Sequence, residues 1–254
     1  MTDAEIRDAA TVVLLRDGAD GLDVWLMTRV TAMAFAAGMA VFPGGRVDTA
    51  DADLPFADGS DGRAAERFDT TPDQARAVVG AAVREVFEET GVLLTVPSAD
   101  MSGARSDVEA GRVSFGDLLR ANGLAVDGSA LHAWSRWVTP KGEVRRYDTR
   151  FFAAAMPDGI DAQDVTTESS SAGWFGVGAV LESAQRGEIG MLPPTIMTLA
   201  SLATYGTVAE VLAAAGQRSL EPVRPIIERD AEGGYLAKLP DGTAFAIPSS
   251  LFPR

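Results

Sequence analysis

Short, mainly apolar runs separated by turn residues occupy the first part of the chain. Residues 9–15 and 22–29 have the length and composition of two strands. The Asp- and Gly-rich stretch 16–21 between them predicts the turn of a hairpin. Residues 41–48 predict another strand that runs into a glycine loop. The chain therefore begins with β-structure.

A helical period replaces the strand pattern between residues 72 and 90. Pro72 suits the first position of a helix, and Gly91 suits the position after the last one. Apolar residues in this stretch recur on one arc of a helical wheel and predict a buried stripe. They are Val79, Val83, Val86 and Phe87.

The rest of the chain alternates between strand and helix patterns. Strands are predicted over 92–96, 131–140, 147–155 and 173–177, and helices over 115–122, 178–186 and 193–215, the last broken at Gly206. Turns at 232–234 and 240–242 predict a final hairpin within 226–247. This order of elements predicts an α+β fold.

One domain is expected over residues 1–254, because the sequence contains neither a repeat nor a linker. Residues 49–72, rich in Asp, Gly and Ala, predict a surface insertion in the form of a flexible loop. Residues 194–254 form a C-terminal extension of helices and the final hairpin.

The charge and the composition exclude several classes of protein. The net charge of −14 opposes nucleic-acid binding, although a small anionic substrate is possible where metal and arginines reverse the local charge. There are no cysteines, which excludes disulfides and thiolate chemistry. His132 is the single histidine, so a Ser-His-Asp hydrolase is a weak candidate.

The sequence pattern predicts neither a membrane span nor a targeting segment. No apolar run reaches the length of a membrane span, and residues 1–8 carry acids in place of a basic leader. The last residues, 251–254, do not resemble a peroxisomal address of the SKL type. These features predict a cytoplasmic enzyme with no membrane partner.

Three glutamates lie within five residues at the end of the predicted central helix. Glu85, Glu88 and Glu89 fall within an arc of roughly 100° on the side away from the apolar stripe, and they are expected to face outward. Such crowded carboxylates suit a hard divalent cation, Mg²⁺ or Mn²⁺. Arg84 lies one turn before Glu88 and can pair with it. The alternative is a solvated acidic face.

These residues resemble a known motif. Residues 84–92, REVFEETGV, resemble the last half of the Nudix box, and residues 42–45, FPGG, resemble its glycine entry. In an uninterrupted box the arginine lies about 14 residues after the second glycine. Here Arg84 lies 39 positions after Gly45 (84 − 45), so an insertion of about 25 residues splits the box. Asp48 and Asp51 lie where the uninterrupted motif has acids, and the insertion leaves open whether either reaches a metal.

The resemblance implies a fold and a chemistry. The fold would be a Nudix-like α/β/α sandwich with a mixed sheet and additional C-terminal helices. Glu85, Glu88 and Glu89 would hold Mg²⁺ or Mn²⁺ for hydrolysis of a pyrophosphate bond, with Arg84 orienting them. One of these glutamates, or Glu168 from a later loop, would take a proton from water. For Glu168 the alternative is a solvated loop acid.

Further segments resemble the coenzyme A diphosphatase branch of this family. They are residues 26–29, 38–45, 137–140 and 146–152. The resemblance implies a small-molecule nucleotide partner, coenzyme A or acyl-coenzyme A, cleaved to 3′,5′-ADP and 4′-phosphopantetheine. One departure is Ala34, where the bacterial signature has arginine. An ADP-ribose or NADH pyrophosphatase, or a non-catalytic nucleotide-binding regulator, therefore remains an alternative. A homodimer is a candidate assembly.

Several residues are candidates for contact with such a substrate. Arg29 matches phosphate oxygens with its forked donors, and Gly44 and Gly45 allow close approach to the pyrophosphate; a surface arginine and a simple turn are the alternatives. Trp174 or Phe42 is a candidate to stack on adenine, with the core favoured for Phe42. A cluster of arginines, either solvated or bound to a 3′-phosphate, comprises Arg145, Arg146 and Arg150.

Overall fold

A mixed β-sheet forms the centre of the computed structural model, which describes residues 4–29, 38–57, 59–60, 63–163, 169–229 and 234–247. The strand order is β10-β3-β2-β1-β8-β7, with β4 paired to β1 and β9 paired to β2. Strand β1 runs parallel to β8 and antiparallel to β2 and β4. The strands are β1 (Ile6–Gly18), β2 (Gly21–Arg29), β3 (Met39–Val41), β4 (Gly44–Arg46), β7 (His132–Val138), β8 (Arg146–Ala155), β9 (Ser169–Gly176) and β10 (Gly190–Met191).

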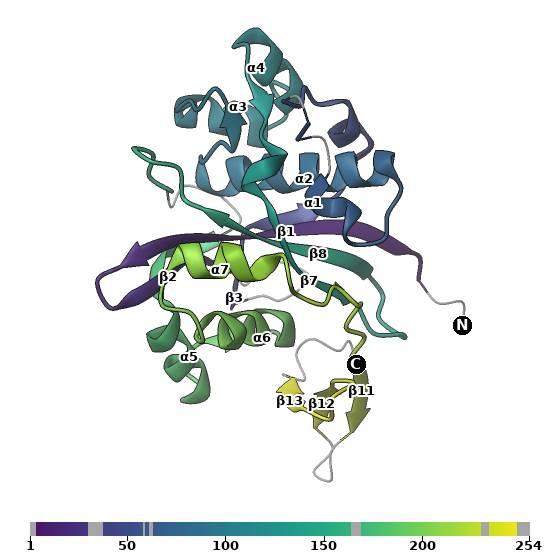
Figure 1. Ribbon diagram of the computed structural model, residues 1–254. Helices are drawn as coiled ribbons and strands as arrows, with labels where there is room; N and C mark the ends of the chain where they lie inside the picture. Colours follow the sequence, from purple (N-terminus) through teal and green to yellow (C-terminus); the bar gives the residue numbers. More distant parts are fainter. Residues whose placement is uncertain are drawn as a thin grey trace.

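Helices cover both faces of this sheet, which confirms the predicted α+β class. Figure 1 shows α1 to α4 on one side of the sheet and α5 to α7 on the other. The helices are α1 (Arg63–Glu66), α2 (Pro72–Thr90), α3 (Arg105–Glu109), α4 (Phe115–Ala121), α5 (Val177–Gln185), α6 (Pro193–Leu202) and α7 (Val208–Ala215). Among the described residues, no helix is both long enough and apolar enough to cross a membrane.

The predicted N-terminal hairpin is confirmed, and its first strand is longer than predicted. Strands β1 and β2 pair from Leu15↔Val24 to Gly18↔Gly21, with a turn at residues 19 and 20. Gly21 has φ of 119°, a conformation that glycine adopts at little cost. The turn therefore begins later than the sequence pattern predicts.

Alternate residues of β1 enter two separate hydrophobic cores, as expected for a sheet covered on both faces. Ala10, Val12 and Leu14 belong to the core beneath α2. Val13 and Leu15 belong to the core formed with α5, α6 and α7.

Helix α2 has the predicted bounds because residues at both ends stop it there. The Thr71 side chain accepts a hydrogen bond from the Gln74 backbone, and Pro72 occupies the first turn. At the other end Gly91 is left-handed, with φ of 76°. The apolar stripe of α2 is fully buried in the core that it shares with β1.

The prediction of a flexible loop at residues 49–72 is wrong for the part that the structure describes. A 3₁₀ helix, η1 (Thr49–Asp53), and helix α1 lie within it. Ala65 and Phe68 are buried, and the Phe68 ring meets Phe152 of the sheet edge-on at 5.5 Å between centroids. Apolar residues among the many Asp and Gly thus anchor the insertion to the core.

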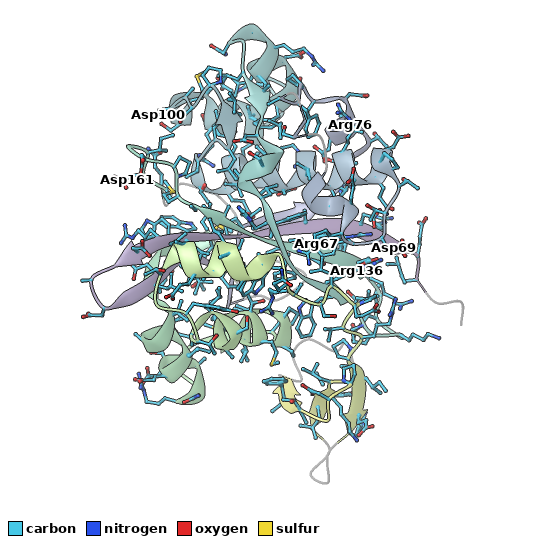
Figure 2. The ribbon with its side chains drawn as sticks, in the orientation of Figure 1. Arg67, Asp69, Arg76, Asp100, Arg136 and Asp161 are labelled. Atoms are coloured by element: carbon cyan, nitrogen blue, oxygen red, sulfur yellow. The ribbon has the colours of Figure 1, made fainter. Side chains whose placement is uncertain are left out.

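The insertion also contacts the C-terminal part of the chain. Arg67 donates hydrogen bonds to the backbone oxygens of Ala215 (2.8 Å) and Arg218 (2.9 Å). Arg136 of β7 donates to the Phe68 oxygen at 2.9 Å. Figure 2 shows Arg67, Asp69 and Arg136 gathered where the insertion meets the sheet.

The C-terminal extension differs from its prediction in one respect. The expected break near Gly206 is confirmed, since α6 ends at Leu202 and α7 begins at Val208. The expected hairpin is part of a three-stranded sheet of order β11-β12-β13. Its strands are β11 (Ile226–Arg229), β12 (Tyr235–Lys238) and β13 (Ala244–Ile247). The single domain over 1–254 stays a prediction.

Smaller elements follow α2 along the chain. Helix α4 begins as predicted at Ser114, whose side chain accepts from the Asp117 backbone. The predicted strand at 92–96 is shorter and pairs with a second short strand in a separate sheet. The elements are β5 (Thr95–Val96), β6 (Ala125–Val126), η2 (Ser102–Ala104) and η3 (Gly128–Ala130).

Candidate active site at the end of helix α2

The three glutamates at the end of α2 are less exposed than predicted. The side chains of Glu85 and Glu88 are 14% and 22% exposed. Glu89 is buried, at 7%, and accepts a hydrogen bond from the Gly44 backbone at 2.7 Å. The prediction that all three face outward is therefore wrong for Glu89, because the glycine segment covers it.

Arg84 connects these glutamates to the insertion. Its Nη1 donates to Glu85 Oε1 at 2.7 Å and to Glu88 Oε2 at 3.4 Å, so the predicted pairing with Glu88 is confirmed. Its Nε and Nη2 donate to the two oxygens of Asp51, at 2.8 and 3.0 Å. Nη2 also donates to the Arg46 backbone oxygen at 3.0 Å. One guanidinium thus fixes three carboxylates and a backbone oxygen.

Burial and charge act in opposite directions on Arg84. Burial lowers its pKa, but the hydrogen bond to Asp51 and the charges of Glu85, Asp51 and Glu88 raise it further, so the net pKa is above its ordinary value. Arg84 is therefore a permanent positive charge among these acids.

Asp51 is a residue of the site whose role the sequence left undecided. It lies in η1, is 2% exposed, and accepts from the Asp48 backbone at 2.8 Å as well as from Arg84. Asp48 itself pairs with Arg46 at 2.9 Å. The signal was present, since Asp51 follows the glycines of the motif, but its contact with Arg84 depends on how the insertion folds.

Gly44 and Gly45 let the β4 segment press against its two neighbours. A side-chain carbon on Gly45 would overlap the Glu85 carboxylate. A side-chain carbon on Gly44 would lie 2.5 Å from the Ala10 backbone oxygen of β1. The lack of side chains thus brings the segment onto the carboxylates. Close approach of this segment to a pyrophosphate stays a prediction.

The Glu88 carboxyl is perturbed by its surroundings. Burial raises its pKa to about 7, against the lowering effect of Arg84 and with a further raising effect of Glu85. Three carboxylates on one helix end supply the oxygen donors that Mg²⁺ and Mn²⁺ prefer. Their oxygens are turned toward Arg84 and Gly44, however, and among the described residues no three Asp, Glu or His side chains converge as a metal site. The carboxylate oxygens are therefore suitable ligands for a divalent ion, but in this arrangement the side chains are not oriented around a common ion position.

The aromatic candidates have different surroundings. Phe42 packs in the core beside α5 to α7, as favoured, and it also borders the apolar cavity, so its stacking on adenine stays a prediction. Trp174 of β9 is half-buried, meets Trp25 edge-on at 5.5 Å and lies beneath Arg16 at 4.4 Å. These contacts occupy Trp174, and stacking on adenine stays a prediction.

Two candidates fall at the edge of what the structure describes. Arg29 ends β2, and its side chain lies outside the described residues. Glu168 and Ala34 lie outside them altogether. The roles of Arg29 and Glu168 stay predictions.

The predicted arginine cluster is divided in the structure. Arg150 is 1% exposed and pairs with Asp8 and, at 3.5 Å, with Asp148, so the expectation of a solvated Arg150 is wrong. Arg145 and Arg146 instead border a cavity with Arg7 and Arg46. Parallel pairing of β1 with β8 is what brings Arg7 to this place.

An apolar cavity of about 230 Å³ begins at the glycine segment, and sequence reasoning missed it. It lies between the sheet, the start of α6 and the terminal three-stranded sheet. Its wall includes Gly44, Thr11, Phe151, Pro193, Ile227 and Ala237. These residues are far apart in sequence. Apart from Gly44, only Pro193 was singled out by the sequence pattern, as the start of the predicted helix that is α6 in the structure.

Comparisons with known proteins agree with this geometry. Residues 56–202 match the family model of the NUDT19 Nudix domain. The chain is similar to the human acyl-coenzyme A diphosphatase NUDT19, at 27% identity over 85% of the chain and 70% of the relative. The Xenopus laevis acyl-coenzyme A diphosphatase NUDT19 is 29% identical over 63% of the chain, which spans about half (48%) of that relative.

A solved structure shows the same fold. The crystal structure of a Nudix hydrolase from Alicyclobacillus acidocaldarius superposes with a TM-score of 0.71 at 29% identity, covering 86% of the chain and 99% of that protein. The chain therefore shares the fold of that Nudix hydrolase over most of its length.

Proposed function

This chain belongs to the Nudix hydrolase family of the NUDT19 Nudix domain, and on that premise we propose that it is a metal-dependent coenzyme A or acyl-coenzyme A diphosphatase. The products would be 3′,5′-ADP and 4′-phosphopantetheine or its acylated form. The alignment with two acyl-coenzyme A diphosphatases supports this substrate. The carboxylates directly behind the glycine segment support hydrolysis of the anhydride, and this is the observation that carries the proposal.

The chemistry divides between the helix end and a bound ion. Nudix hydrolases generally use divalent metal ions, and such an ion neutralises phosphate oxygens and lowers the pKa of water. Glu85, Glu88 and Glu89 would hold it. Hydrogen bonds from Arg84 orient the carboxylates of Glu85 and Glu88. One glutamate, or Glu168, takes the proton of the attacking water, and one phosphorus–oxygen bond of the anhydride breaks.

The apolar cavity supports a substrate with an acyl chain. One wall is Gly44, whose backbone nitrogen donates a hydrogen bond to Glu89, so the cavity and the carboxylates lie on either side of the same segment. Contact between methylene groups and apolar side chains such as Phe151 and Ile227 lowers the free energy, because both surfaces are removed from water.

A substrate panel tests the proposal. Purified protein is incubated with Mg²⁺ or Mn²⁺ and coenzyme A, an acyl-coenzyme A, ADP-ribose or NADH, and the products are identified by mass. Release of 3′,5′-ADP is expected, and its loss in Glu89→Gln would place the chemistry on α2. Release of AMP from ADP-ribose or NADH alone would reject the coenzyme A assignment and retain the family chemistry.

The sequence departure at Ala34 is the observation that keeps the ADP-ribose or NADH substrate as a second candidate. A non-catalytic nucleotide-binding regulator is excluded by any turnover that Glu88→Gln abolishes. The choice between Mg²⁺ and Mn²⁺, the homodimer and the cytoplasmic location stay predictions.

A further inference from the structure

A second cavity, of about 470 Å³, has a charge opposite to that of the whole chain. The net charge of the chain is −14, yet this cavity is bordered by four arginines and a single acid, Glu5. We call it the arginine pocket; its arginines are Arg7, Arg46, Arg145 and Arg146. An excess of positive charge within an acidic surface indicates an anionic ligand.

The charges of this pocket are only partly neutralised by the protein. Arg46 pairs with Asp48, but both side chains are well exposed, at 59% and 45%, so water weakens the pair. Arg146 is buried and donates to the Thr139 backbone oxygen at 3.3 Å. Within the described part of the chain, Arg7 and Arg145 have no carboxylate partner. Two guanidinium groups therefore remain available for an anion.

Strand register places this pocket beside the apolar cavity. Arg7 lies opposite Tyr147, Ala9 opposite Arg46 and Thr11 opposite Gly44. Positions two apart on a strand share a face, so these pairs lie on the same face of the sheet. Tyr147 borders both cavities, which makes them neighbours.

The same segment connects the arginine pocket to the carboxylates. The Arg46 side chain borders the pocket, while its backbone oxygen accepts from Arg84. One residue earlier, Gly45 packs on Glu85. A ligand in the pocket is thus separated from the carboxylates by the thickness of β4.

We propose that the arginine pocket binds a phosphate monoester of the substrate, apart from the anhydride that is cleaved. This inference rests on the proposed function, in which that group is the 3′-phosphate of coenzyme A. A phosphate dianion accepts paired hydrogen bonds from guanidinium groups, and Arg7 and Arg145 supply donors without a competing carboxylate. ADP-ribose and NADH lack a phosphate monoester, so the pocket selects coenzyme A against them.

The kinetic test compares coenzyme A with 3′-dephospho-coenzyme A. The native enzyme is expected to prefer coenzyme A through a lower KM. In the double variant Arg7→Gln/Arg145→Gln, the KM for coenzyme A rises by about tenfold, and the ratio of kcat/KM values for the two substrates falls toward one. Arg186→Gln, directly after the last residue of α5, removes an exposed positive charge outside both cavities and keeps the native ratio. An unchanged ratio in the double variant overturns the proposal.

A binding measurement separates this inference from the proposed function. Calorimetry of the full chain compares adenosine 3′,5′-bisphosphate with AMP. Tighter binding of the bisphosphate, lost in the double variant, supports the pocket even if coenzyme A is not cleaved. Equal affinity for the two nucleotides overturns it even if coenzyme A is a substrate. Circular dichroism of each variant verifies that the fold is retained.

Discussion

The two sides of the Gly44–Arg46 segment are built in different ways. On the α2 side, Arg84 binds Glu85, Glu88 and Asp51, and the Gly44 backbone binds Glu89. On the cavity side, one border is apolar and the other is a group of arginines with few acids. The difference shows that the charged groups proposed for chemistry are fixed by protein partners, whereas the surfaces proposed for recognition keep their capacity for a ligand.

The largest expected effect breaks the carboxylate side itself. Glu88→Gln keeps the shape of the side chain but removes its charge, and we expect kcat to fall by about 10³-fold, within the usual range for an acid–base group. The rate of anhydride cleavage measures this. Glu182→Gln, an exposed acid on α5, serves as the control and keeps the native rate. Equal rates in Glu88→Gln and the native chain would contradict the assignment of the site.

The next effect concerns the anchor of Arg84. Asp51→Ala leaves the largely buried guanidinium of Arg84 without its bidentate partner, and we expect a loss of about 3 kcal/mol in the free energy of unfolding. Urea denaturation measures it. Asp53→Ala, an exposed acid in the same 3₁₀ helix, is the comparison and is expected to cost less than about 1 kcal/mol. Similar losses in both variants would mean that the pair contributes little.

The adjacent glycines allow the two sides to be disturbed one at a time. At Gly45 an added methyl meets the Glu85 carboxylate, a side-chain end that can be displaced from Arg84 without moving the backbone, so Gly45→Ala is expected to lower activity by about 30-fold with little change in stability. At Gly44 it meets the backbone of β1, which cannot give way, so Gly44→Ala is expected to cost about 2 kcal/mol. Thermal unfolding and activity are measured for both.

A third glycine serves as the control for that pair. Gly178 lies in α5, and a methyl there meets nothing within 4 Å. Gly178→Ala is therefore expected to be neutral or slightly stabilising. If Gly44→Ala and Gly45→Ala have the same profile, the two sides of the segment are not independent.

The smallest expected effect sharpens the cavity side. Ala237→Leu adds bulk to the wall of the apolar cavity, and the preference for a long-chain acyl-coenzyme A over coenzyme A should fall by about fivefold. The ratio of kcat/KM values measures it. Ala246→Leu on the neighbouring strand adds the same bulk at an exposed position and keeps the native preference. An unaltered ratio in Ala237→Leu would remove the acyl chain from this cavity.

The sequence predicted those parts of the site that depend on neighbouring residues. The bounds of α2 follow from Thr71, Pro72 and Gly91, and the pairing of Arg84 with Glu88 follows from helical spacing. These features need only local geometry. The position of the glycine segment near the acids was instead predicted from its resemblance to the Nudix box.

The remaining parts depend on contacts between distant residues. Asp51 reaches Arg84 because the insertion folds back on α2, and Glu89 is buried because β4 pairs with β1. The arginine pocket brings Arg7 and Arg145 together because β1 pairs with β8, although the two residues are far apart in sequence. No periodicity in one segment contains this information, since it arises from register and packing.

The contacts of Arg67 join the insertion to residues that lie beyond the family match. The family match ends at residue 202, yet the backbone oxygens that Arg67 binds belong to Ala215 and Arg218, and the Arg218 guanidinium covers the Trp134 ring at 3.8 Å. A fragment cut at that boundary would lose the acceptors of one arginine and the cover of a central tryptophan. The segment that the family model matches is therefore shorter than the structure that these contacts join, and an excised or transplanted version that stops at residue 202 would lose them.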